Sequence, residues 1–127
     1  MKIYLGEIYT RYMAEEKKEQ LFELQREIIV ELSTSRHLEI PKYFVTDFAS
    51  VPKFFWSIIG PIGKFNLASV IHDYFYTYHT TTRALADKEF YLWMKFTNPK
   101  AYIRNTLMYW GVRLFGAKRW RYYGNGI

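Results

Sequence analysis

The chain has 127 residues, half of them apolar and a fifth aromatic, so it is not intrinsically disordered and is expected to form a single domain, residues 1–127, around one core. It contains no cysteine, which excludes disulfides, thiolate metal sites and cysteine nucleophiles. The formal net charge is +6, but residues 90–127 carry +7 without an acid, whereas residues 1–89 carry −1. The C-terminal third should therefore prefer an anionic surface.

The first 45 residues are predicted to be mainly strands. Residues 22–32 alternate apolar and charged side chains with period two, which predicts a half-buried strand or hairpin arm. Short strands are expected around residues 3–9, 38–40 and 43–45, and the charged residues 15–19 are expected to connect the first strand to the long one. These segments predict a small antiparallel sheet at the N-terminus.

From Ser50 the periodicity becomes helical, and residues 50–123 are predicted to be mainly helix. Ser50 can cap a short helix with Pro52 in its first turn, and three more helices are expected at about residues 67–78, 83–96 and 100–114. A threonine among residues 80–82 can cap the helix that begins at residue 83. The predicted class is α+β, with the sheet first, three to four helices after it and a central helix hairpin.

In the helix at residues 67–78, a second stripe of side chains lies opposite the apolar one, and it contains His72, Asp73 and Tyr76. His72 and Tyr76 are four residues apart and can meet along the helix. The simpler interpretation of this stripe is a solvated face. A large aromatic among polar residues, and Asp87 within an apolar stripe of the next helix, favour a site instead.

Asp87 needs a partner, because a carboxylate in an apolar stripe is costly unless it is paired or hydrogen-bonded. The connection at residues 78–82 is short, so the two helices should pack as an antiparallel hairpin. His72 and Asp87 lie at similar distances from this turn and should face each other, with Asp87 fixing the imidazole tautomer so that the other nitrogen can act as a base. Asp73 projects about 100° away and is a candidate cation ligand.

Asp47 belongs to a second polar cluster, residues 46–52. The simpler interpretation of this cluster is a helix entry in which Ser50 is the cap and Asp47 lies near the positive helix end. Asp47 is also a candidate metal ligand or a carboxylate that supports one.

Three motifs carry a resemblance to a known family: FVTDFASVP at residues 44–52, HDYFY at residues 72–76 and ADKEF at residues 86–90. In this order they resemble the family catalogued as domain of unknown function 1353, found in tailed bacteriophages and prophages. The resemblance covers about residues 38–116, including RLFG at residues 113–116. It implies a phage origin, and hence a location in the host cytoplasm or the virion, without implying an activity.

The pattern His-Asp-x-x-Tyr on one helix and an Asp on the next is similar to secreted phospholipase A2, especially its disulfide-free parvoviral form. This similarity implies that His72 activates water, Asp73 binds calcium, Tyr76 supports the site and Asp87 orients His72. It also implies that loop carbonyls near residues 60–63 complete a calcium site. The loop departs from the phospholipase spacing, since Gly60 and Gly63 are only three residues apart.

The C-terminal end interleaves aromatic residues with cations. This combination suits an anionic membrane surface or a phage structural protein, with nucleic acid as a less favoured partner because no groove-reading motif is present. The expected contact cations are Arg113, Lys118, Arg119 and Arg121. The alternative is a helix that packs its aromatics inside and leaves its cations in water. Residues 124–127 are expected to be a flexible end.

No signal peptide is expected, because Glu7 interrupts the N-terminus before an apolar core can form. No transmembrane segment is expected either, because the longest uncharged run near the middle, residues 54–63, is half the required length. Two functional hypotheses follow. One is a phage hydrolase that uses His72 and Asp87 with a divalent cation, calcium above others, at the host envelope. The other is a non-enzymatic virion or tail-associated adaptor.

Overall fold

The computed structural model describes residues 1–16, 19–46 and 66–125. Its contacts group the chain into two compact units, Met1–Asp47 and Phe48–Ile127. The helix predicted to start at Ser50 lies outside the described residues. Strands occupy the first unit and helices the second, and this confirms the predicted α+β class.

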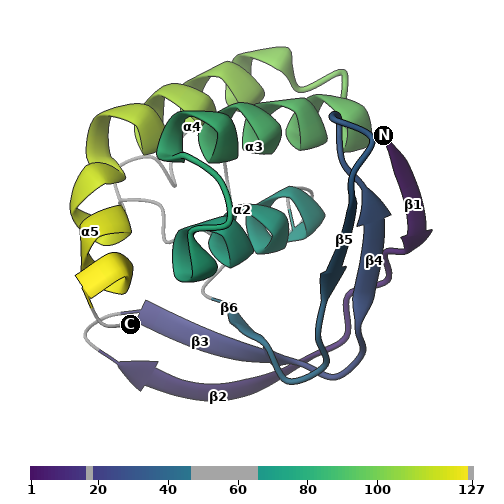
Figure 1. The fold of residues 1–127 in the computed structure, drawn as a ribbon, viewed down its shortest axis with the longest axis vertical. Helices are drawn as coiled ribbons and strands as arrows, with labels where there is room; N and C mark the ends of the chain where they lie inside the picture. The colour runs from purple at the N-terminus through teal and green to yellow at the C-terminus, as the bar shows by residue number, and fades with distance from the viewer. Residues whose placement is uncertain (17–18, 47–65, 126–127) are drawn as a thin grey trace. The chain divides into compact units, whose positions relative to one another are not determined.

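The first unit contains two three-stranded antiparallel sheets (Figure 1). One has the order β1 (Lys2–Leu5), β4 (Ile28–Glu31), β5 (His37–Ile40), and the other has the order β2 (Thr10–Glu16), β3 (Glu19–Leu24), β6 (Val45–Thr46). Their register follows side-chain burial: Ile28 pairs with Ile40 and Val30 with Leu38, and all four are buried. The period-two pattern of residues 22–32 thus identified the buried residues of β4, and β5 coincides with the short strand expected at residues 38–40.

The prediction of one continuous strand over residues 22–32 is wrong. β3 ends at Leu24 and β4 begins at Ile28, so this segment supplies one strand to each sheet. The backbone of Leu24 instead exchanges hydrogen bonds with Tyr43 and Phe44: its amide donates to the Phe44 carbonyl and its carbonyl accepts from the Tyr43 amide. The residues of the bend, 25–27, include neither glycine nor proline, so no local signal marks the change of sheet.

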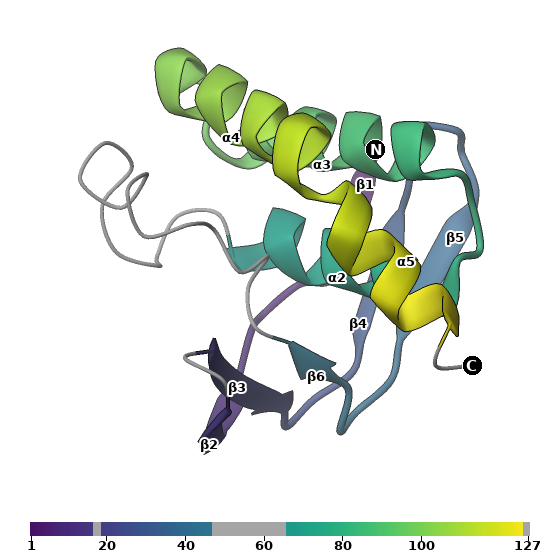
Figure 2. The same ribbon diagram turned by 90° about the vertical axis from the view of Figure 1, so that its left-hand side faces the viewer.

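The second unit is built from helices α2 (Asn66–Tyr78), α3 (Arg83–Thr97), α4 (Tyr102–Phe115) and α5 (Ala117–Asn125). α2 packs against α3, α3 packs against α4, and α5 returns to contact both α2 and α4 (Figures 1 and 2). Thr82 caps α3 by accepting a hydrogen bond from the Leu85 amide at 3.2 Å, as predicted.

α5 was not predicted as a separate helix. α4 ends at Phe115 and α5 begins at Ala117, so only Gly116 separates them and the boundary contains no loop that sequence patterns would detect. Residues 124 and 125, which were expected to belong to a flexible end, are the last two residues of α5. Among the described helices, none is both long and apolar enough to cross a bilayer.

Candidate active site

Asp87 of α3 is fully buried, and its carboxylate receives hydrogen bonds from two neighbouring helices. His72 Nε2 and the Tyr76 hydroxyl, both on α2, each lie 2.7 Å from Oδ1. Arg113 Nη1, on α4, lies 2.8 Å from Oδ2, and Arg83 Nη1 lies 3.5 Å from the same oxygen. Both oxygens are therefore occupied by donors, which is the condition under which a buried carboxylate is tolerated.

The charge of Asp87 is maintained by these donors. Burial by itself raises the pKa of the Asp87 carboxyl, but hydrogen bonds from His72, Tyr76 and Arg113 outweigh it and hold the pKa below its usual range. The same contact, first of all the hydrogen bond to Asp87, raises the pKa of Arg113. Asp87 is thus a permanent anion at neutral pH, and its charge is balanced by the Arg113 guanidinium.

His72 is oriented by Asp87, as the hairpin geometry predicted. Its side chain is 3% exposed, and its ring lies between those of Tyr76, at 4.2 Å, and Phe90, at 4.5 Å between centroids. Since the ionised Asp87 can only accept, Nε2 must carry a hydrogen and donate it. In the neutral imidazole this assignment places the lone pair on Nδ1, the nitrogen that faces away from Asp87.

Tyr76 adds a neutral donor to the cluster. Burial, followed by the charge of Asp87 and the hydrogen bond to it, raises the pKa of Tyr76 above its usual range, so the hydroxyl keeps its hydrogen. Gly116 leaves the space for this hydroxyl: a Cβ at residue 116 would lie 2.6 Å from the Tyr76 oxygen and in collision with the Val112 carbonyl. The α4–α5 junction therefore requires glycine for steric reasons.

Arg83 fixes the position of Arg113. Its two terminal nitrogens donate to the carbonyl oxygens of Val112, at 3.1 Å, and Arg113, at 3.2 Å. Both carbonyls belong to the last turn of α4, where the Val112 oxygen also accepts a hydrogen bond from the Gly116 amide at 2.8 Å. One guanidinium thus caps α4 while it lies 3.5 Å from Asp87, and it holds the start of α3 against the end of α4.

Arg113 was expected to contact an external partner, but its guanidinium turns to Asp87, with the side chain 28% exposed. A contact of Arg113 with a partner stays a prediction. The signal that identifies the contact between Arg113 and Asp87 is the one used for His72. The connection between α3 and α4 is short, and Asp87 and Arg113 lie at similar distances from it along their helices. A second antiparallel hairpin therefore brings them to the same level.

The interpretation of the polar stripe of α2 as a solvated face is also wrong. His72, Asp73 and Tyr76 are 2%, 4% and 1% exposed. The apolar stripe is buried as well, at Val70, Ile71 and Phe75, so α2 is buried on both sides over most of its length. A helix in this position cannot be divided into core and solvent faces by its period alone.

Asp73, the residue after His72, is buried. Asp47 and the loop at residues 60–63, whose carbonyls were predicted to bind calcium, lie outside the described residues. Within the described ranges, no three His, Asp or Glu side chains gather as a metal site. Calcium takes six to eight oxygen ligands. The described residues therefore do not by themselves fit calcium, and Asp73 and Asp47 stay predicted ligands.

The basic C-terminal end divides between interior and surface. Trp120 is half-buried, with its ring stacked on His79 at 3.6 Å and edge-on to Tyr76 at 5.1 Å, which agrees in part with the alternative interpretation of this end. Lys118 and Arg121 are exposed, and Arg119 is half-buried. Trp110 of α4 remains 55% exposed.

Comparison with known proteins identifies the family. The model of the family described as protein of unknown function, DUF1353, matches residues 22–112, which include Asp87, His72 and Tyr76. The chain belongs to this family. The match confirms the family resemblance of the three motifs, and the second and third of these motifs supply His72, Tyr76 and Asp87 to the buried cluster.

This DUF1353 chain is also similar to an uncharacterized protein, y4jT, of Sinorhizobium fredii (strain NBRC 101917 / NGR234). The two are 35% identical over 98 residues, which is 76% of this chain and 29% of the relative. The chain thus spans less than a third of the length of that protein. No solved structure matches the chain.

Proposed function

We propose that this DUF1353 protein is a phage-derived hydrolase in which His72 activates water for attack on an ester of the host envelope. One observation carries the proposal: a buried, ionised carboxylate, Asp87, holds Nε2 of His72 at 2.7 Å. A base of this kind needs a second group that fixes its tautomer and stabilises the imidazolium that forms. The resemblance of the HDYFY motif to phospholipase A2 supplies the substrate class, an ester-linked lipid.

The chemistry follows from the orientation of the ring. A water that hydrogen-bonds to Nδ1 gives its hydrogen to His72 while its oxygen forms a bond to the ester carbonyl carbon. His72 then transfers this hydrogen to the leaving alcohol oxygen as the carbon–oxygen bond breaks. Asp87 stays ionised throughout, and its charge favours the transient imidazolium.

Arg113 moderates this charge effect. Because its guanidinium binds Oδ2 of Asp87 at 2.8 Å, part of the carboxylate charge is already balanced before His72 becomes cationic. Oδ1 accepts from His72 and Tyr76, so one carboxylate oxygen binds the base and the other binds the cation. Tyr76 is a positioning residue in this proposal, because its hydroxyl touches Asp87.

A second candidate function is a non-enzymatic adaptor of the phage particle, in which the cluster only joins the helices. The burial of the His72 side chain, 3% exposed, favours it. The groups that contact Asp87 come from α2 and α4 in addition to α3 itself, so the cluster connects three helices and can stabilise their packing.

The experiment compares His72→Gln with His79→Gln in the full chain. Both changes replace a histidine in or next to α2, but His79 stacks on Trp120 and has no contact with Asp87 in the described structure. Turnover of fluorogenic phospholipid in vesicles is measured with and without calcium, and folding is followed by circular dichroism. We expect His72→Gln to lower turnover at least about 100-fold, in the range of general-base catalysis, while His79→Gln stays near wild type.

A wild-type protein without turnover in either condition, or a His72→Gln variant with full turnover, would exclude the hydrolase. Co-purification of such an inactive protein with phage particles would support the adaptor.

A further inference from the structure

The outer side of α4 carries an apolar stripe that is exposed among the described residues of the unit. Ile103, Trp110 and Leu114 are 61%, 55% and 69% exposed. Their spacing of seven and four residues places them on one side of the helix. Apolar residues at helical spacing normally face a core, so a stripe of this kind on the surface indicates a contact with something outside the unit.

The stripe cannot turn inward, because the opposite side of α4 is fixed. Asn105 and Met108 are 1% and 4% exposed on that side. Asn105 donates to the Asn98 carbonyl at 3.1 Å, and Arg113 reaches Asp87 at 2.8 Å. A rotation of α4 that buried Leu114 would break the ion pair of the neighbouring residue. The exposure of the stripe is therefore a consequence of the same contacts that hold the Asp87 cluster.

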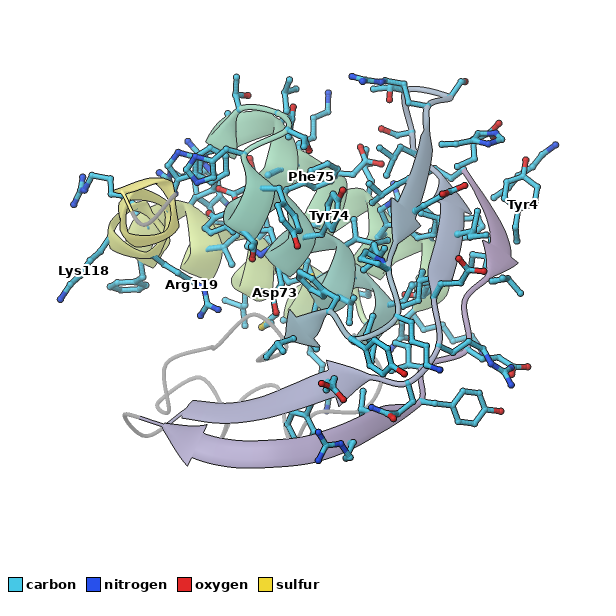
Figure 3. The ribbon with its side chains drawn as sticks, turned by 60° about the horizontal axis from the view of Figure 1, so that its bottom comes forward. Tyr4, Asp73, Tyr74, Phe75, Lys118 and Arg119 are labelled. Carbon is cyan, nitrogen blue, oxygen red and sulfur yellow. The ribbon has the colours of Figure 1, made fainter. Side chains whose placement is uncertain are left out.

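Cations lie close to α4 in sequence, and acids are absent from the whole C-terminal third. Lys100 precedes α4, Arg104 lies on its first turn, and Lys118 and Arg121 are exposed on α5. Figure 3 shows the Lys118 side chain extending outward from α5. Residues 90–127 carry a formal +7. An apolar stripe close in sequence to lysine and arginine, with an exposed tryptophan, has the composition of a helix that lies in a membrane interface.

We infer that α4 docks on an anionic phospholipid surface, with Ile103, Trp110 and Leu114 in the headgroup–acyl boundary and the nearby cations at the phosphates. Charge complementarity selects this occupant, because juxtamembrane lysine and arginine are attracted to anionic headgroups. A second copy of the chain is disfavoured as the occupant, since a two-fold contact through α4 would bring two sets of cations together. α4 lies on the surface in this proposal and does not span the bilayer.

The inference goes beyond hydrolysis and is tested separately from it. Flotation of the full chain with vesicles of phosphatidylglycerol and phosphatidylcholine, and with phosphatidylcholine alone, measures binding at low and high salt. The decisive variant is Leu114→Asp, and its matched control is Leu85→Asp, which makes the same change at a leucine of α3 that is 53% exposed. We expect Leu114→Asp to lower the partition coefficient at least tenfold and Leu85→Asp to change it less than twofold.

Two further readouts follow from the same geometry. Tryptophan emission should shift to shorter wavelength on vesicles in a Trp56→Phe background, since Trp56 lies outside the described residues. In that background Trp110→Phe should remove most of the shift, because Trp110 is 55% exposed, whereas Trp93 is fully buried and Trp120 is half-buried and stacked on His79. Binding should weaken with salt, because screening acts on exposed charges.

The inference is overturned if the wild-type protein does not bind anionic vesicles, if it binds vesicles of phosphatidylcholine alone equally well, or if Leu114→Asp binds anionic vesicles as tightly as wild type. A wild-type dimer in sedimentation that Leu114→Asp converts to a monomer, without vesicle binding, would assign the stripe to a second copy instead.

Discussion

Arg113 and Leu114 are neighbours on α4, and their burial is the reverse of what their polarity predicts. The cation reaches a fully buried carboxylate, whereas the leucine is 69% exposed. One buried acid, Asp87, thus determines which side of α4 faces the interior. Once α3 contributes a carboxylate to the interior, the facing helix must supply a cation there, and its apolar stripe is left on the surface.

The largest effect is expected at Asp87, where the interior contacts converge. Asp87→Ala should lower the free energy of unfolding by about 3–5 kcal/mol, because it leaves the Arg113 guanidinium and the His72 ring nitrogen without their acceptor. Urea denaturation measures the change. The neighbouring Lys88→Ala, at an exposed residue of the same helix, should stay within about 0.5 kcal/mol of wild type. Equal effects of the two variants would show that the cluster does not hold the helices.

The comparison between Arg113 and Leu114 can be tested directly by alanine substitution. Arg113→Ala should cost about 2 kcal/mol, since it removes a hydrogen bond between charged groups, and Arg83 remains near Asp87 as a partial replacement. Leu114→Ala should change stability by less than about 0.5 kcal/mol because its side chain is largely exposed. A larger loss in Leu114→Ala than in Arg113→Ala would reverse the assignment of inside and outside.

The smallest effect is a dependence of stability on pH. The pKa of Asp87 is lowered in the folded protein, so its ionisation stabilises the fold above the unfolded pKa of about 3.9, and this contribution is lost as pH falls through the folded pKa. The stability difference between wild type and Asp87→Asn should therefore be constant near neutral pH and shrink below about pH 4. A difference that stays constant down to pH 3, or grows with acid, would show that Asp87 is not the ionised partner.

The contact between His72 and Asp87 was predictable because it depends on local rules only. A helical period, a Thr82 cap and a short connection specify an antiparallel hairpin, and residues at equal distances from its turn must meet. Arg113 meets Asp87 for the same reason, because α3 and α4 form a second antiparallel hairpin. Its charge alone suggests a position in solvent, and the contact follows only when Asp87 is expected to need a cation from α4.

Other features were not predictable from the same patterns. The stripe of Ile103, Trp110 and Leu114 has the spacing of a core face, and only the burial of Asn105 and Met108 shows that the core lies on the other side. The bend between β3 and β4 has no glycine or proline, and its strands separate because Leu24 bonds to residues 43 and 44. Both outcomes depend on contacts distant in sequence, which periodicity does not contain.

The most direct test of the central claim is the position of the hydrogen on the His72 ring. Nitrogen-15 NMR of histidine-labelled protein at neutral pH resolves Nδ1 and Nε2 of the three histidines, and His72→Gln assigns the signals. We expect a hydrogen on Nε2 that is hydrogen-bonded to Asp87 and protected from exchange with water, and that loses this protection in Asp87→Ala. A His72 ring with its hydrogen on Nδ1 and a bare Nε2 would contradict this assignment.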